Sequence, residues 1–254
     1  MTRRSAQLIP LLVAVLVGVA APAQAQVPDD TNTEVSLGYE FRRRIKERLR
    51  NFGDLVYERR IDPDFPSGSQ NEWSTTGGLS YDINKRLRFE GGLGLYYTDR
   101  PDLTDTLETR LWQAATVDWP NGPRGMKRFT LHHRFRLEER FRKTEDWSFA
   151  LRFRYRLAIS LPLNHSSVGP RTFYLPLKAE FFFPLGDDIE KLFAKQARYT
   201  AGVGYVFSKS WTIELRFAQQ RLRDTIDADI RVTDHLVQLR VKSSFRIADL
   251  IRGR

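Results

Sequence analysis

Five arginines in two neighbouring stretches of the chain carry the strongest chemical signature. Arg134 and Arg136 alternate with other residues in one stretch, and Arg152, Arg154 and Arg156 do so in the next. A guanidinium group is permanently charged and binds carboxylates or phosphates through two parallel hydrogen bonds. The two rows therefore predict either an anion-binding lining or a set of ion pairs with carboxylates from elsewhere in the chain.

Acidic residues at the same kind of alternating position can supply those carboxylates. Like charges directly opposite one another destabilise a sheet, so arginine rows on adjacent strands need neutralising partners. Two hypotheses stay open: a lumen closed by its own ion pairs, and a hydrated cationic lumen that admits or binds a small anion. The candidate lumen-lining residues are Arg134, Arg136, Arg152, Arg154, Arg156, Glu90, Glu108, Glu180 and Glu214.

A second basic cluster lies near the start of the chain, at residues 42–50. On an exposed loop, its cations can pair with the phosphates of lipopolysaccharide. The alternative is a solvated loop without a ligand. The candidate lipopolysaccharide contacts are Arg42, Arg43, Arg44, Lys46, Arg48 and Arg50.

Residues typical of catalysis are sparse. His133 is expected on the apolar side of its strand, without a serine at a matching depth on either neighbour, and His132, His165 and His235 lack a nucleophile as well. Metal-ligand spacings and phosphate-binding glycine loops do not occur. We therefore expect no catalytic residue, metal or cofactor. A lipid-modifying enzyme remains an alternative, and it needs a histidine beside a serine and an acidic or amide group that orients it.

The strands that position these side chains are visible as strict alternation. In residues 147–162, aromatic and aliphatic residues occupy one face and three arginines the other. A strand this long, apolar on one face and charged on the other, is typical of a wall between lipid and a polar lumen. We predict an all-β fold: an antiparallel, up-and-down transmembrane β-barrel.

Ten such strands are expected, with twelve as the fallback. The segment 42–71 is interpreted as a long outer loop, in which residues 54–61 are a possible extra strand. Ten strands place the two tightest turns, at 84–85 and 208–210, on the periplasmic side. The expected strands are residues 34–41, 72–83, 87–98, 106–119, 127–141, 147–162, 172–185, 196–207, 211–222 and 231–247.

The first 25 residues have the pattern of a cleaved signal peptide. Arg3 and Arg4 precede an apolar run at 8–20, and small residues follow at Ala23 and Ala25. Residues 26–254 then form a single barrel domain, exported to the outer membrane of a Gram-negative bacterium. The chain has no cysteine and a net charge of +10. The expected partners are membrane lipid, lipopolysaccharide and the barrel-assembly machinery, with no nucleic acid and no oligomer indicated.

The segments 131–140, 151–162 and 178–182 resemble the bacterial family catalogued as domain of unknown function 2490. The resemblance spans roughly residues 72–245 and implies an outer-membrane-type β-barrel of unassigned activity, without catalytic residues to transfer. One feature departs from such barrels. Their last strand typically ends in an aromatic residue, whereas here residues 246–254 follow Phe245.

The leading functional hypothesis is a structural or narrow small-solute barrel that leans toward anions and has no catalysis. The lipid-modifying enzyme is one alternative. Another is a soluble periplasmic barrel that binds lipid or another ligand, which would turn apolar side chains inward and the arginines outward.

Overall fold

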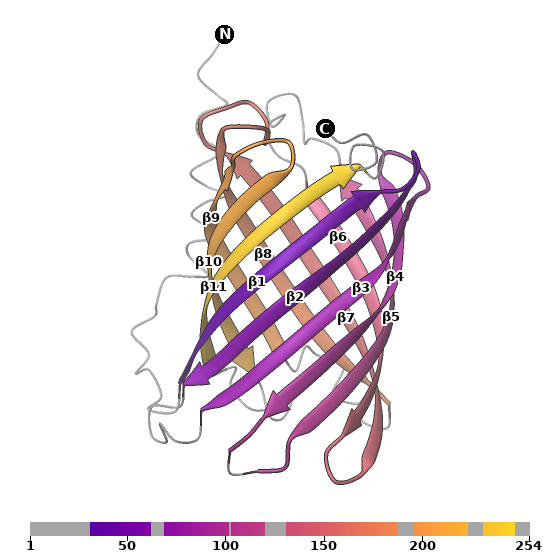
Figure 1. Cartoon of the computed structure of the whole chain (residues 1–254), viewed down its shortest axis with the longest axis vertical. Coiled ribbons are helices and arrows are strands. Elements are labelled where there is room, and N and C mark those ends of the chain that lie inside the picture. The colour runs from indigo at the N-terminus through magenta and orange to yellow at the C-terminus, as the bar shows by residue number, and fades with distance from the viewer. Residues whose placement is uncertain are drawn as a thin grey trace.

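Eleven strands form one closed barrel in the described part of the chain (Figure 1). The computed structural model describes residues 31–61, 69–101, 103–119, 131–186, 196–222 and 231–246, so the predicted signal peptide lies outside the described residues. No helix in these residues is long and apolar enough to cross a membrane. The strands are β1 Asn32–Arg44, β2 Leu49–Ile61, β3 Gln70–Asp82, β4 Leu87–Asp99, β5 Thr106–Trp119, β6 Leu131–Lys143, β7 Trp147–Pro162, β8 Thr172–Leu185, β9 Gln196–Val206, β10 Trp211–Leu222 and β11 Arg231–Arg246.

The barrel closes between β1 and β11, which run parallel and lie side by side in Figure 1. Their register extends from the pair Asn32 and Asp234 to the pair Arg44 and Arg246. All other neighbouring strands are antiparallel. With an odd number of up-and-down strands, the first and the last necessarily point in the same direction, so a parallel seam is the geometric consequence.

The predicted all-β, up-and-down barrel is confirmed, and its eleven strands lie between the expected ten and the fallback of twelve. The interpretation of residues 42–71 as one long loop is wrong, because β1 continues to Arg44 and β2 begins at Leu49. A tight turn joins them, in which the amide of Ile45 donates to the carbonyl oxygen of Leu49 at 2.9 Å. Strand β2 mixes polar and apolar residues on both faces, which weakens the alternation that identifies a strand.

The two faces of the wall differ sharply in chemistry. On the outer face, large apolar side chains are exposed, such as Leu93 at 56%. On the inner face, charged side chains are enclosed, and Glu138 has an exposed fraction of 0%. This distribution is opposite to the one that a soluble ligand-binding barrel requires.

Aromatic side chains fill the inside of the barrel where facing glycines make room. The indole of Trp112, exposed by only 1%, lies over Gly92 on the paired strand β4. A Cβ at Gly92 would lie 2.9 Å from Cζ2 of Trp112 and would collide with the carbonyl oxygen of Gly77. On the other side of the barrel, Tyr174 occupies the space over Gly204 in the same way.

We predict that Gly92→Ala lowers the free energy of unfolding by about 1–3 kcal/mol, because overpacking forces the backbone and Trp112 to shift. The matched control is Gly91→Ala on the outer face, where a Cβ would lie 3.6 Å from the nearest atom, the carbonyl oxygen of Trp112. Urea unfolding followed by tryptophan fluorescence measures both variants. Equal stability losses would contradict this account of the interior.

Candidate functional site

The candidate site is the charged interior of the barrel. The register between β6 and β7 pairs Arg134 with Arg156 and Arg136 with Arg154, both on the inner face. The two arginine rows are therefore direct neighbours, and their repulsion has to be offset by other groups.

Glu138 is the carboxylate at the centre of these rows. It lies opposite Arg152 and binds its guanidinium at 2.5 Å, while Arg136 lies at 3.0 Å and Arg154 at 3.7 Å. Glu138 was not among the candidate residues. Strand alternation places Glu138 on the same face as Arg136. Only the register between β6 and β7 shows that its carboxylate contacts arginines from both of these strands.

Two further carboxylates take up the remaining arginines of these rows. Glu180 on β8 binds Arg154 at 2.6 Å and lies 3.9 Å from Arg156. Glu90 on β4 binds Arg134 at 2.8 Å and lies 3.7 Å from Arg42. Since β4 and β6 are not neighbours in the sheet, the pair of Glu90 with Arg134 links strands that share no backbone hydrogen bonds.

Glu108 on β5 collects a second group of arginines. The guanidinium of Arg140 donates two hydrogen bonds to its carboxylate, at 2.6 and 2.8 Å, and Arg142 donates at 3.0 Å. Arg110 on the same strand also donates to Glu108. One buried carboxylate thus interacts with three cations.

Glu214 on β10 is the centre of a third group. It accepts hydrogen bonds from Tyr174, from Arg216 and from Lys242, the last at 2.8 Å. Glu40 on β1 lies 3.6 Å from Arg216 and 3.8 Å from Lys242. This group therefore connects β8, β10 and β11 with the first strand of the barrel.

Aromatic rings also stabilise the positive charge of the inner arginines, which outnumber their carboxylate partners. The guanidinium carbon of Arg136 lies 4.1 Å from the ring centroid of Trp112, and that of Arg110 lies 3.5 Å from Tyr96. Arg152 and Arg154 both lie over Phe182, at 5.1 and 4.9 Å. Such cation–π contacts are stronger in a desolvated interior than in water. The aromatic rings were not among the candidate site residues.

All nine predicted lumen-lining residues thus lie on the inner face, and each has a partner of opposite charge within 4.0 Å. Trp112, Glu138 and Glu214 are almost completely buried, so the inner side chains pack closely around them. The geometry favours a lumen closed by ion pairs over one lined by unpaired cations.

The basic cluster at 42–50 does not form one exposed patch. Arg42 and Arg50 point inward, toward Glu90 and Asp82 respectively. Arg43 lies over the ring of Phe41 at 5.1 Å. The members that remain exposed, around the turn between β1 and β2, are Arg44, Lys46 and Arg48.

The histidines make contacts of a structural kind. Nδ1 of His133 lies 2.8 Å from the hydroxyl of Tyr155, and Nδ1 of His132 lies 2.7 Å from Asp118. His235 stacks on Phe217. Within the described ranges, none of these three histidines bonds a serine, and no cluster of His, Asp and Glu that could hold a metal ion is formed.

Comparison with known families gives a match over most of the chain. The model of the family described as protein of unknown function (DUF2490) matches residues 34–231, which run from β1 to the start of β11. The chain therefore belongs to this family. No match was found among curated proteins.

We predict that Glu138→Gln lowers the free energy of unfolding by about 3–5 kcal/mol, because it leaves buried cations without their carboxylate. The control is Glu139→Gln. Glu139 is the next residue along β6, points to the outer face and bonds Gln113 at 3.3 Å. Urea unfolding compares the two variants, and a large loss in both would show that the inner position has no special role.

Proposed function

We propose that this member of a family of unknown function spans the outer membrane of a Gram-negative bacterium as a barrel closed inside by ion pairs. The observation that carries the proposal is the inverted distribution of side chains. Apolar residues such as Leu55 and Phe149 are exposed over the outer face, while charged residues are enclosed. Soluble proteins rarely expose continuous apolar surfaces of this extent, whereas hydrocarbon stabilises them.

The closed sheet supports the same conclusion. Every strand is hydrogen-bonded on both sides, including β1 and β11 across the parallel seam. In hydrocarbon an unpaired backbone group costs several kcal/mol, so only helices and closed barrels are stable across a bilayer. The strands contain 11 to 16 residues, and about 9–11 tilted residues suffice to span the hydrocarbon.

Aromatic residues near the strand ends are placed as interfacial girdles require. Trp147 and Trp211 begin β7 and β10, and Trp119 ends β5; all three are exposed. Amphipathic rings are favoured at the level of the lipid headgroups. The girdle therefore marks the two boundaries of the apolar band.

The predicted signal peptide at residues 1–25 is consistent with export, and Phe245 near the end of β11 is the candidate signal for the barrel-assembly machinery. In this proposal the exposed cations Arg44, Lys46 and Arg48 face lipopolysaccharide phosphates at the end of the barrel that also carries the β3–β4 turn. The added strand β2 thus moves the tight turn at 84–85 from the predicted periplasmic side to the outer side. In this proposal the barrel is a structural element of the membrane, with lipid as its principal partner.

A second candidate function, a narrow passage for anions, is favoured by Lys178 on β8. Its side chain points inward, is partly exposed, and has no ion pair or hydrogen bond within the residues that the structure covers. It lies in the field of Arg156, Arg216 and Lys242. The positive field of these neighbouring side chains would attract a small anion that entered the lumen beside Lys178.

Membrane insertion is tested with an arginine on the outer face. We predict that Leu93→Arg, at the middle of β4, lowers the fraction of refolded protein that floats with lipid vesicles. A cation at the bilayer midplane costs about 2–4 kcal/mol. The control is Leu103→Arg in the connection between β4 and β5, where the side chain is also exposed. A water-soluble barrel would tolerate both substitutions equally.

The state of the lumen is tested by conductance in planar bilayers. We expect the folded wild-type barrel to be silent in a salt gradient, because paired side chains fill its middle. Discrete anion-selective steps that disappear or change selectivity in Lys178→Glu would instead support the anion passage. Flotation with vesicles verifies that the silent protein is inserted.

A further inference from the structure

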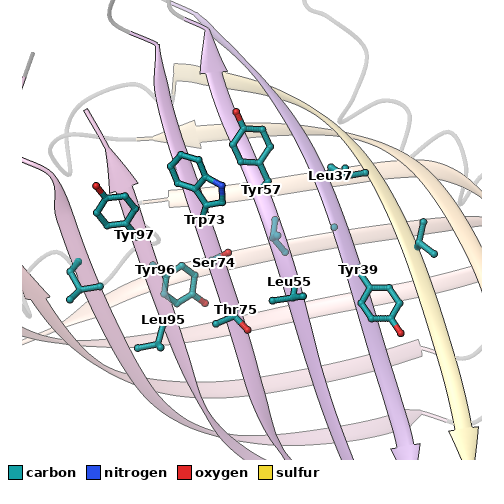
Figure 2. A pocket seen from close by; sticks show the side chains of 14 residues that line it. Leu37, Tyr39, Leu55, Tyr57, Trp73, Ser74, Thr75, Leu95, Tyr96 and Tyr97 are labelled. Carbon is teal, nitrogen blue, oxygen red and sulfur yellow. The ribbon is translucent and has the colours of Figure 1, made fainter. Parts of the chain in front are cut away.

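The outer face of the barrel is hollowed over β2, β3 and β4, beside the parallel seam (Figure 2). The volume of this hollow is about 700 Å³. We call it the outer groove. Its outward side chains are almost entirely apolar. They are Leu37, Tyr39, Leu55, Thr75, Leu95, Leu107 and Val241, together with the aromatic wall described below.

The groove exists because a small residue lies between large ones. Thr75 on β3 is paired with Leu55 on β2 and Leu95 on β4. The hydroxyl of Thr75 donates to the carbonyl oxygen of Asp54 at 3.0 Å, so its hydrogen-bonding capacity is used by the backbone of β2. The floor of the groove therefore presents a methyl group, with leucines on both sides.

One end of the groove is bounded by an aromatic wall, formed by Tyr57, Trp73 and Tyr97 from three adjacent strands (Figure 2). Their ring centroids are 5.4 and 6.0 Å apart. The tyrosine hydroxyls donate away from the groove, to Asn71 at 2.9 Å and to Asp105 at 2.5 Å. The hydrogen bond from Tyr97 lowers the pKa of the Asp105 carboxyl, which stays charged at neutral pH.

Beyond the wall lies a polar row of three outward residues in register, Arg59, Asn71 and Asp99. The amide of Asn71 donates to Asp99 at 3.4 Å. Neither Arg59 nor Asp99 has an ion pair in the part of the chain that is described. The two residues lie two strands apart, so their backbones are roughly 9–10 Å from each other. An arginine and an aspartate, neither of them in an ion pair within the described residues, thus lie at the same end of an apolar groove.

We propose that the outer groove binds one phospholipid with a phosphate and a primary ammonium in its headgroup, the phosphate on Arg59 and the ammonium on Asp99. An acyl chain lies in the apolar groove below the aromatic wall. This inference rests on the proposed insertion of the barrel in a membrane. The charges in the row match a zwitterionic headgroup, whereas a purely anionic one would meet the carboxylate of Asp99.

The geometry also discriminates between zwitterionic lipids. A primary ammonium donates hydrogen bonds to the carboxylate of Asp99, whereas a quaternary ammonium has no N–H to donate. Phosphatidylethanolamine is therefore preferred over phosphatidylcholine, and both over phosphatidylglycerol with the same acyl chains.

The experiment is native mass spectrometry of the refolded barrel in detergent with an equimolar mixture of these three lipids. We expect the wild type to retain one phosphatidylethanolamine molecule. Arg59→Gln reduces retention roughly tenfold, since a charge-assisted hydrogen bond is lost. Asp99→Asn removes the preference over phosphatidylglycerol, and Thr75→Trp, which fills the floor of the groove, reduces retention of all three lipids.

The matched control is Lys143→Gln, which removes an exposed outward cation at the same end of the barrel but outside the groove. Equal retention by Arg59→Gln, Lys143→Gln and the wild type would overturn the inference, as would a second copy of the chain bound in place of lipid. Flotation with vesicles is measured in parallel. A barrel that inserts but shows no lipid preference refutes the groove site alone, whereas failure to insert refutes the proposed function as well.

Discussion

The enclosure of many arginines within a narrow closed sheet is the constraint on which the rest of the structure depends. Guanidinium groups keep their charge, so each one has to be neutralised or placed against an aromatic face. Glu138, Glu108 and Glu214 each serve several cations at once. Other ion pairs, such as Glu90 with Arg134 and Glu40 with Arg216, link strands that are not neighbours in the sheet. Part of the solution to the charge problem therefore also holds the barrel together across its interior.

The same wall has a second surface with a different chemistry. Strand alternation sends the charges inward and leaves leucine, phenylalanine, tyrosine and tryptophan outside. The choice of small or large residues then shapes each face. Gly92 makes room for Trp112 inside the barrel, and Thr75 makes the floor of the outer groove outside it. Local residue size thus decides where the interior is filled and where the exterior is hollow.

Closure with an odd number of strands has a further consequence. Strand β1 begins at one end of the barrel and β11 ends at the other, because the two run parallel. The turn between β1 and β2 and the turn between β3 and β4 lie at the same end, and the amide of Asp82 bonds the carbonyl oxygen of Arg48 there at 2.9 Å. The inner arginine Arg50 forms an ion pair with Asp82 at that end. This ion pair offsets part of the positive charge of the basic run at 42–50, which surrounds the tight turn between β1 and β2.

Much of this protein follows from the sequence alone. Strict alternation, as in β7, determined the fold class and which face each arginine occupies, because the period of a strand is two. Because the alternation of β2 is weak, the sequence did not identify this strand and predicted a loop at 42–71 instead. Register, by contrast, is set by pairing over the whole sheet, and only the tertiary structure decided that Glu138 lies between Arg136 and Arg152. The outer groove was likewise invisible in the sequence, since it depends on Leu55, Thr75 and Leu95 meeting from three strands.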